Sequence, residues 1–318
     1  MSSDAGGPLD LVVIGDLNPD AIVAGADLEP EFGQAEVLAD AGVLALGGSG
    51  GIVSSGAARL GLRVGHVGVV GDDAAGRFVL DELDRRGVDL VWCQVDSSRP
   101  TGITAALSRG DDRAILTFQG TIAALDAAAV PAAALEQARH VHISSFYLQD
   151  GLRDDAADLL SKARAAGATT SLDCGWDPRD EWAGGLDAAL ESANAFFPNG
   201  AEACRIAHCN DPEEALDRLA ARGPTVAVKL GGRGAIARRG SERAAATPPP
   251  VASIDATGAG DSFAAGFIRG MLDGRPLQET LNLAVACGAL STRALGGVDA
   301  QPALAEALAV IGRSEARA

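Results

Sequence analysis

The stretch LDLVVIG, residues 9–15, is the first part of the sequence from which the fold can be inferred. It is a short apolar run that ends in glycine. Runs of this kind are typical of strands that are buried on both faces of a parallel sheet. We therefore expect a central first strand here, with helices on both sides of the sheet.

Beyond this strand, helix-like and strand-like segments alternate, as in βαβ units. Helices are expected at residues 51–61, 74–87, 153–167 and 212–223, in the Ala-rich segment 123–138 with a break near Pro131, and in two C-terminal segments. Further strands are expected at residues 63–71, 140–146, 169–174 and 225–231. No internal repeat or composition break divides the chain. Residues 1–318 are therefore interpreted as one α/β domain, doubly wound around a mostly parallel sheet flanked by helices.

Two segments depart from this alternation. Residues 18–46 have broken, partly alternating apolarity with Pro and Gly, which is typical of short strands. Residues 101–120 contain two strand-like runs joined by the polar stretch Arg109 to Arg113, which predicts a hairpin. We interpret about 18–46 and 96–120 as β excursions from the main sheet.

The charge of the chain excludes some classes of partner. It has 26 Lys and Arg against 43 Asp and Glu, a net charge of -17, which repels nucleic-acid phosphates and anionic lipid surfaces. The N-terminus lacks a signal-peptide pattern, and no apolar run reaches the ~18 residues of a membrane span. We expect a cytoplasmic protein that binds small molecules, with no nucleic-acid or membrane partner.

The 5 cysteines form no CxxC pair and are interpreted as reduced thiols. The group Cys204, His208 and Cys209 lacks an evident fourth ligand for zinc, so packing is the better explanation.

The stretch DATGAGDSF, residues 255–263, combines small residues and two carboxylates at the start of an apolar, helix-like segment. A glycine-rich turn that enters a helix offers free N–H groups and the positive end of the helix dipole to an anion. Neither Lys162 nor Lys229 follows a glycine, which excludes a Walker A loop, and the third glycine of a dinucleotide fingerprint is absent. What the stretch does offer is a set of backbone amides, which suit the stabilisation of an oxyanion, beside the Asp261 carboxylate, which suits the acceptance of a proton. Alternatively, Asp261 only complements the helix dipole.

A second glycine-rich stretch, GGSGGIVSSGAARLG at residues 47–61, favours the catalytic role of Asp261 over the role of complementing the helix dipole. Taken together and in this order, the two motifs resemble those of the ribokinase-like sugar kinases, the PfkB carbohydrate kinases, and the resemblance covers nearly the whole chain. It implies ATP-dependent transfer of the γ-phosphate to a hydroxyl of a small sugar or sugar-like alcohol. It also implies that the two excursions form a small β-sheet lid that excludes water. Because such lids often pair between subunits in relatives, we expect a homodimer.

The resemblance assigns roles within the motif at 255–263. Asp261 matches the catalytic base, and Gly258, Ala259 and Gly260 match the anion hole. An aspartate near its ordinary pKa is a weak base, which the loose transition state of phosphoryl transfer tolerates. Asp255 matches a position near a monovalent-cation site, for which K⁺ is the candidate, and its alternative role is to cap the turn.

On the ATP side, Asn199 and Glu202 match an Asn-x-x-Glu element that organises Mg²⁺ through water and phosphate oxygens. The same spacing is also that of a capping box, which needs no ligand. Lys229 precedes a glycine turn, which suits contact with phosphate, whereas its alternative is a solvent-exposed strand end. The other matched ATP-side positions are Gly231, Gly232, Gly234, Thr257, Asn282, Ala286 and Gly288. In the last three, an ordinary packed helix would look the same.

On the sugar side, Asp20 matches the aspartate that accepts hydrogen bonds from sugar hydroxyls, with Asn18 close by. The alternative is that Asn18 to Asp20 is only a turn. Gly47 and Gly48 match the pair of glycines that lets the backbone approach the sugar.

Other sugar-side positions are less regular. Ile52 stands where the family often has Asn, so the usual amide contact is absent and the expectation of ribose is weakened. Phe118 and Gln119 are further candidates for the pocket. His142 lies in an apolar strand and is expected in the core.

Three other functions stay open on the sequence. A nucleoside kinase of the adenosine type on the same scaffold is the nearest. A non-catalytic sugar- or nucleotide-binding protein is a second, against which the intact Gly258 to Asp261 segment argues. A phosphosugar kinase would need extra cations, for which Arg109 and Arg113 are the chief candidates.

Overall fold

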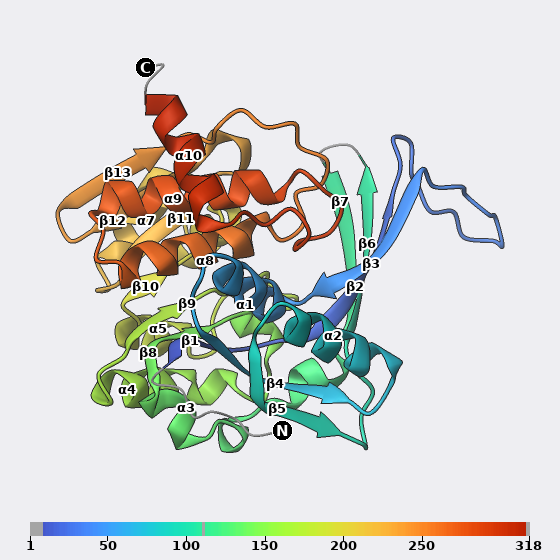
Figure 1. Ribbon diagram of the computed structural model, residues 1–318, viewed down its shortest axis with the longest axis horizontal. Coiled ribbons are helices and arrows are strands. Elements are labelled where there is room, and N and C mark those ends of the chain that lie inside the picture. The colour runs from blue at the N-terminus through green and yellow to red at the C-terminus, as the bar shows by residue number, and fades with distance from the viewer. Residues whose placement is uncertain (1–8, 110–111, 316–318) are drawn as a thin grey trace.

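A computed structural model describes residues 9–109 and 112–315, and a nine-stranded sheet forms the centre of this part of the chain (Figure 1). Its strand order is β13-β12-β11-β10-β9-β8-β1-β4-β5. The strands are β1 (Leu9–Ile14), β4 (Val64–Gly71), β5 (Asp89–Asp96), β8 (Ala138–Ile143), β9 (Thr169–Leu172), β10 (Ala195–Phe196), β11 (Thr225–Lys229), β12 (Ala235–Arg239) and β13 (Glu242–Ala246). β1 pairs in parallel with β4 and β8, which confirms the buried interior strand predicted from LDLVVIG.

Helices cover both faces of this sheet (Figure 1). On one face lie α1 (Ser49–Arg59), α2 (Ala74–Arg85), α8 (Ala259–Leu272), α9 (Leu277–Ser291) and α10 (Leu304–Glu315). On the other lie α3 (Ala132–Glu136), α4 (Ala156–Ala165), α5 (Leu186–Ser192), α6 (Gly200–Ala207) and α7 (Pro212–Ala220). The apolar strands are thus buried between two helical layers, which confirms the doubly wound α/β architecture.

Several local predictions need correction. The Ala-rich segment 123–138 is not one interrupted helix, because it forms short 3-10 turns at Gly120–Ala124 and Ala127–Ala129 before α3. Asp126 caps the second turn by accepting from the amide of Ala129, and Pro131 then starts a new element. The strand β5 and the third C-terminal helix, α10, were not predicted. The segments 1–8 and 110–111, including the centre of the predicted hairpin turn, lie outside the described residues.

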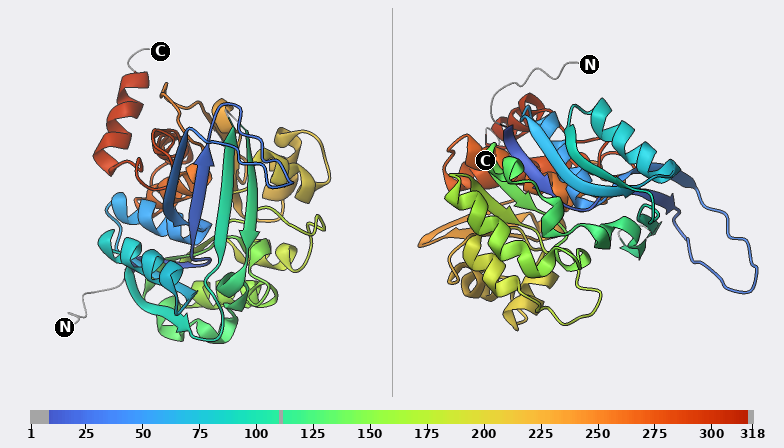
Figure 2. Two further views of the ribbon diagram at one scale, coloured as in Figure 1. Left: turned by 90° about the vertical axis from the view of Figure 1, so that its right-hand side faces the viewer. Right: turned by 90° about the horizontal axis from the view of Figure 1, so that it is seen from below.

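A second sheet of four strands stands beside the main one, in the order β3-β2-β6-β7 (Figure 2). Its strands are β2 (Asn18–Ala24), β3 (Ala41–Gly47), β6 (Ile103–Arg109) and β7 (Asp112–Phe118). β2 pairs antiparallel with β3 but parallel with β6, so the sheet joins the two predicted excursions. The exposed loop 25–40 extends from it between β2 and β3 (Figure 2). We call this four-stranded sheet the lid.

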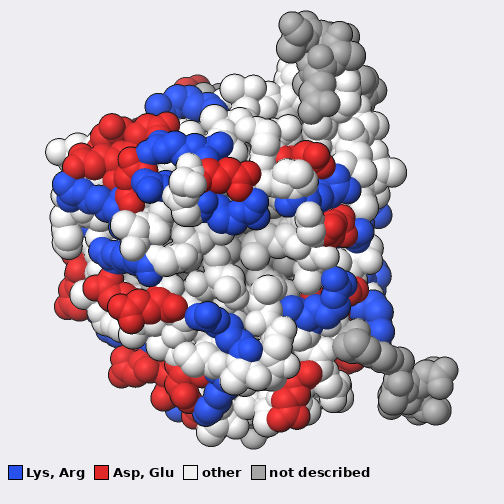
Figure 3. Space-filling view, turned by 90° about the vertical axis from the view of Figure 1, so that its left-hand side faces the viewer, with Lys and Arg blue, Asp and Glu red and all other residues white. Residues whose placement is uncertain are grey.

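Charged side chains of both signs are interleaved on the face that β12, β13 and α7 form (Figure 3). Arg238 and Arg243 both pair with Asp217 there, and Arg239 pairs with Glu242 at 2.7 Å. The arginines are thus neutralised locally. In the described residues, none of the helices is both long and apolar enough to cross a membrane.

Candidate active site

Two glycines at the start of α8, Gly258 and Gly260, stand at close approaches. Gly258 has φ 70°, in the left-handed region, and a Cβ there would lie 2.5 Å from the Cα of Gly297. A Cβ on Gly260 would lie 3.2 Å from the Nζ of Lys229. These glycines therefore let the backbone come close both to a neighbouring loop and to a cationic side chain.

The first amides of α8 are largely free of protein acceptors. Ala259 donates to the carbonyl of Ala256 at 3.3 Å. Among the described residues, the N–H groups of Gly258, Gly260 and Asp261 have no hydrogen-bond partner, and no side chain caps the helix. The helix therefore begins with unpaired donors at its positive end, an arrangement that suits an anion.

Asp261 lies in the first turn of α8, where its half-buried carboxylate accepts a hydrogen bond of 2.6 Å from the hydroxyl of Ser49. Burial, followed by the negative charge of Asp173, raises the pKa of Asp261 to about 7, although Lys229 and the Ser49 hydroxyl act in the opposite direction. The expectation of an ordinary aspartate pKa is therefore wrong. A carboxylate with a pKa near 7 is a much better proton acceptor at neutral pH.

Lys229 reaches the same place from the end of β11. Its Nζ donates to the carboxylate of Asp173 at 2.8 Å, and both side chains are largely buried. Burial alone would lower the pKa of Lys229, but the charges of Asp173, Glu202 and Asp261 outweigh it and raise this pKa. The site thus holds one lysine that stays charged among three carboxylates.

Asn199 and Glu202 form the capping box of α6. The Asn199 side chain accepts from the amide of Glu202 at 2.9 Å, and the Glu202 carboxylate accepts from the amide of Asn199 at 2.7 Å. The backbone of Asn199 also forms a parallel β-bridge with the backbone of Lys229. The cap therefore exists, and it places Glu202 within electrostatic range of Lys229 and Asp173.

The start of α1 is closed by a side chain of its own chain. The carboxylate of Asp16 accepts from the amides of Ser49 at 3.0 Å and Gly50 at 2.8 Å, and from the Ser144 hydroxyl at 3.2 Å. Gly48 has φ 70°, and a Cβ there would lie 2.8 Å from the carbonyl oxygen of Asp16. Burial raises the pKa of Asp16. This glycine-rich helix start is therefore occupied by a buried carboxylate.

The lid contributes polar groups to the same region. The Asn18 amide donates to Asp20 at 3.1 Å and to Thr104 at 3.1 Å, and Thr104 lies 3.2 Å from the hydroxyl of Thr117. Burial, then the charges of Asp16 and Asp261, raises the pKa of Asp20 to about 7. A Cβ on Gly47 would overlap the Asp20 carboxylate, so glycine is needed there. We call the surface that carries Asn18, Asp20, Thr104 and Thr117 the inner lid face.

Three predicted sugar-side residues lie elsewhere. Phe118 pairs with Ile103 and therefore lies on the opposite face of the lid from Thr104, with 56% of its side chain exposed. Ile52 is buried against Gly258 and Gly297, beneath the start of α8. Gln119 donates to the carbonyl of Leu148. The structure does not bring these side chains to the inner lid face.

His142 is a core residue, as expected. It is fully buried, bonds to the Ser171 hydroxyl at 2.8 Å and stacks on Phe197. Burial lowers the pKa of His142 to about 4, so the ring is neutral at physiological pH.

The remaining ATP-side positions form two groups. Gly231 and Gly232 lie in the open turn between β11 and β12, where a Cβ would meet nothing, whereas Gly234 is held tightly against Ala246. On α9, Ala286 is buried and Gly288 lies against the carbonyl of Ala259. Asn282, also on α9, accepts a hydrogen bond from Gln278.

Asp255 ties the loop before α8 together. Its carboxylate accepts from the amide and the hydroxyl of Thr257, at 3.0 and 2.8 Å, and from the amide of Gly296 at 2.9 Å. Within the described residues, no cluster of three or more His, Cys, Asp or Glu is arranged to hold a metal ion.

Four groups of the site were not assigned from the sequence: Asp16, Ser49, Ser144 and Asp173. Asp16 lies two residues after the end of β1, Ser144 directly follows β8 and Asp173 directly follows β9, so all three stand at carboxyl ends of parallel strands. That position is a general signal for ligand sites in open α/β sheets. Ser49 carries no such signal, because only the fold brings it to the Asp261 carboxylate.

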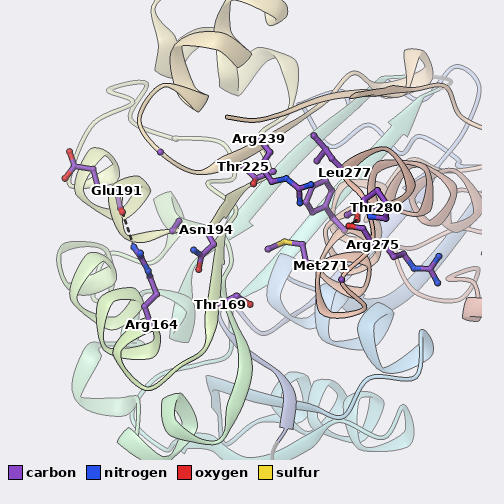
Figure 4. Close-up of a pocket in the computed structure, with 15 residues that line it drawn as sticks. Arg164, Thr169, Glu191, Asn194, Thr225, Arg239, Met271, Arg275, Leu277 and Thr280 are labelled. Atoms are coloured by element: carbon purple, nitrogen blue, oxygen red, sulfur yellow. Dashed lines mark hydrogen bonds between the residues drawn. The ribbon is translucent and has the colours of Figure 1, made fainter. Parts of the chain in front are cut away.

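A hollow of about 820 Å³ opens at the opposite edge of the sheet, where β9, β10 and β11 begin (Figure 4). Its rim carries three arginines, each with a partner: Arg164 donates to the carbonyl of Glu191, Arg239 to Glu242, and Arg275 to Asp273. Because the hollow lies where these strands begin, it is separate from the cluster around Asp261, which lies where the strands end.

The fold and the cluster of residues around Asp261 together are typical of an α/β phosphotransferase. In the described residues, the amides at the start of α8 are unpaired, and they lie beside the Asp261 carboxylate and next to the lid. A family model described as pfkB family carbohydrate kinase matches residues 9–304, and the chain belongs to this family. It is an ATP-dependent carbohydrate kinase.

The chain is similar in sequence to one curated sugar kinase and similar in fold to two solved kinases. The chain is 30% identical over 270 residues to a 2-dehydro-3-deoxygluconokinase of Bacillus subtilis, with 81% of this chain and 83% of the relative covered. A ribokinase of Arabidopsis thaliana, complexed with ribose and ATP, has a similar fold, with a TM-score of 0.79, 24% identity, and coverage of 96% and 99% of the two chains. An adenosine kinase from Sinorhizobium meliloti gives a TM-score of 0.81 at 23% identity, with 98% and 99% covered.

Proposed function

We propose that this protein transfers the γ-phosphate of ATP to a hydroxyl of a small neutral sugar, with Asp261 as the base. The acceptor O–H gives its proton to the Asp261 carboxylate, and its oxygen forms a bond to the γ-phosphorus. The bond from that phosphorus to the β-phosphate oxygen breaks, which releases ADP. Residues 1–318 work as one domain in this proposal, with the lid closing over the acceptor.

The single observation that carries the proposal is the start of α8. Unpaired amides of Gly258 and Gly260 lie next to a carboxylate whose pKa is raised to about 7. Amides aimed at a migrating phosphoryl group stabilise its equatorial oxygens, and the raised pKa lets Asp261 accept a proton near neutrality. Ser49 already donates a hydroxyl hydrogen to this carboxylate, as an alcohol substrate would.

The residues around Lys229 suit a nucleotide with magnesium. Mg²⁺ is usually held by one or two carboxylates together with phosphate oxygens and water, so a three-carboxylate cage is not required. Asp173 and Glu202, both within range of Lys229, are the carboxylates that would serve it. When bound, the ion supplies charge neutralisation and alignment of the phosphates. Lys229 contacts the same phosphates, with Gly231 and Gly232 beside the nucleotide and Asn282 and Ala286 near the base.

Electrostatics favour an uncharged acceptor. The region near Asp261 contains Asp16, Asp20 and Asp173, whose charges would repel a carboxylate or phosphate on the sugar. The inner lid face presents a carboxylate, an amide and two hydroxyls, which are the partners that sugar hydroxyls need. Of the two cations considered for a phosphosugar, Arg109 pairs with Glu29. Arg113 lies on the same face of the lid as Thr104 and Thr117, and its charge acts on Asp20, but the carboxylates of this region outnumber it.

The lid has a second, apolar face that we propose as a homodimer contact. Leu44, Ile103, Leu116 and Phe118 are exposed there by 55%, 43%, 66% and 56%. A flat sheet face with this composition is costly to leave in water, and pairing with the lid of a second copy would cover it.

A nucleoside acceptor is the second candidate, and one residue favours it. Trp176 lies in the segment after β9, close in sequence to Asp173, with its indole 51% exposed and packed edge-on against Trp182. In the nucleoside alternative, the exposed indole stacks on the base.

The deciding experiment measures ADP release with Mg²⁺, with and without K⁺, on a panel of acceptors. Neutral sugars, nucleosides, sugar acids and sugar phosphates are compared by kcat/KM. Highest turnover on a neutral sugar supports the proposal, whereas a preference for nucleosides selects the second candidate. A preference for anionic sugars would overturn the electrostatic argument, and enhancement by K⁺ would support a cation near Asp255.

A further inference from the structure

Gln301, in the segment between α9 and α10, is a buried amide that the function described above does not use. Its side chain is 3% exposed and fully hydrogen-bonded. The amide nitrogen donates to the carbonyl of Ile52 at 2.9 Å and to the hydroxyl of Ser262 at 3.1 Å, and the amide oxygen accepts from Ser55 at 2.7 Å. Two of these partners belong to α1 and one to α8.

The partners of Gln301 flank the contact that brings the catalytic carboxylate to α1. Ser262 directly follows Asp261 in α8, and Ile52 lies one helical turn after Ser49 in α1. The hydroxyl of Ser49 and the carboxylate of Asp261 are 2.6 Å apart. Gln301 thus joins the same two helices close to where they meet at the site.

Helices α1 and α8 approach each other closely at Gly56. At Gly56 a Cβ would lie 2.9 Å from the amide nitrogen of Gln301 and 3.2 Å from the Cβ of Ala265, so the helices approach through small residues. Buried hydrogen bonds are lost when their partners move. If either helix shifted, polar groups on both helices would lose their hydrogen bonds to the Gln301 amide.

We propose that Gln301 is a positioning residue, which fixes the first turn of α8 relative to α1 so that the Asp261 carboxylate keeps its place for phosphoryl transfer. The inference rests on the proposed role of Asp261 as the base. Ser55 and Ser262 are the hydroxyls through which Gln301 acts.

The test compares Gln301→Met with Asn194→Leu, two substitutions that keep side-chain size and remove the hydrogen bonds of an amide. Asn194 accepts from the amide and hydroxyl of Thr170 at 2.8 and 3.1 Å, at the edge of the sheet remote from Asp261. Both variants lose some stability. In Gln301→Met alone, kcat falls by about 10- to 100-fold, because sub-ångström misplacement of reacting groups has effects of that order. The KM for ATP changes less than threefold, on the order of measurement scatter between related variants.

Two further readouts separate positioning from a purely structural role. Because the Ser49 hydrogen bond lowers the pKa of Asp261, its loss in Gln301→Met moves the acid limb of kcat/KM to higher pH. The charged groups that also act on Asp261 are Asp16, Asp20, Asp173 and Lys229, and none is altered. Amide hydrogen exchange at residues 49–56 and 258–266 becomes faster in Gln301→Met and not in Asn194→Leu.

Unchanged kcat, pH profile and exchange in Gln301→Met would overturn the positioning role, as would equal effects in both variants. Gln301→Glu keeps the acceptor for Ser55 but turns a buried carboxylate oxygen toward the carbonyl of Ile52, so its kcat should fall at least as far as that of Gln301→Met. If the wild-type protein phosphorylates no acceptor, the proposed function fails, and hydrogen exchange still judges whether Gln301 holds the two helices together.

Discussion

The two glycine-rich helix starts, of α1 and α8, resemble each other in sequence but differ in what fills them. Both have a glycine with φ 70° at the N-cap, and both expose small residues to the same region. At α1, the amides of Ser49 and Gly50 bond to Asp16. At α8, the amides of Gly258 and Gly260 have no partner within the described residues.

The difference shows that a glycine-rich turn identifies a possible anion site, and that the local supply of carboxylates decides whether a ligand can use it. An internal carboxylate at α1 satisfies the helix dipole and fixes the turn, which is a structural role. The open start of α8 keeps unsatisfied donors, and this makes it available to phosphate.

The largest effect is expected from Asp261→Asn, which removes the proton acceptor at the open helix start and keeps its shape. We expect kcat to fall by about 10² to 10⁴-fold, the usual worth of a positioned base. Titration calorimetry should show nearly unchanged binding of a non-hydrolysable ATP analogue. Turnover within a few-fold of wild type would assign the base to another residue.

Gly258→Ala tests whether the open start depends on close approach. The substitution places a Cβ 2.5 Å from the Cα of Gly297 in a left-handed residue, so both stability and kcat should fall. Gly240→Ala is the matched control, since it also has positive φ, at 60°, but nothing within 4 Å. The control loses about 1 to 2 kcal/mol from backbone strain alone, measured by urea unfolding, and keeps its kcat. Equal losses in both would contradict the contact argument.

The pH dependence should follow the two raised carboxyl pKa values. Because Asp261 and Asp20 titrate at about 7, kcat/KM should fall as pH drops below about 7. The folded state holds these protons more tightly than the unfolded state does. Between the ordinary pKa of 3.8 and about 7, the free energy of unfolding contributed by these groups therefore falls as pH rises. An acid limb near pH 4 would contradict the raised values.

Asp16→Asn tests the closed helix start. The amide side chain can accept from one of the two backbone amides, so the other is left unpaired, at a cost of roughly 1 to 3 kcal/mol in the free energy of unfolding. Loss of the Asp16 charge also lowers the pKa of Asp20 and Asp261, which shifts the acid limb of kcat/KM to lower pH. A shift to higher pH would show that Asp16 is not a source of negative charge at the site.

Ser49→Ala should have the smallest effect. It removes one hydrogen bond to Asp261 that lowers the carboxyl pKa, so the acid limb moves to higher pH while kcat at its plateau changes only a few-fold. The measurement is a kcat/KM profile with the same acceptor as for the wild type. A large loss on the plateau would make Ser49 a participant in the chemistry.

Much of the fold follows from local pattern. The run at residues 9–15 and the alternation after it predicted the parallel sheet, because buried strands need continuous apolar residues. β5 was missed because most of its residues are not buried, and the Ala-rich segment was misjudged because alanine favours helix without specifying where it ends.

The site was less predictable than the fold. Asp261 and the glycines at 258 and 260 stand next to each other in the sequence, so their chemistry could be inferred together. The raised pKa of Asp261, the Lys229–Asp173 ion pair and the place of Ile52 beneath α8 depend on segments far apart in the chain. Such contacts arise only when the helices and strands are assembled.

The parallel pairing of β2 with β6 also determines how the lid can move. The pairing is continuous from Asp20 with Thr104 to Ala24 with Ser108, and it joins the two excursions, which are distant in sequence, into one sheet. A movement of the lid must change the backbone of all the segments that join it to the main domain. Three of these segments contain Gly48, Gly102 and Gly120. In the proposed catalytic cycle the four strands of the lid therefore move together, and neither excursion can open by itself.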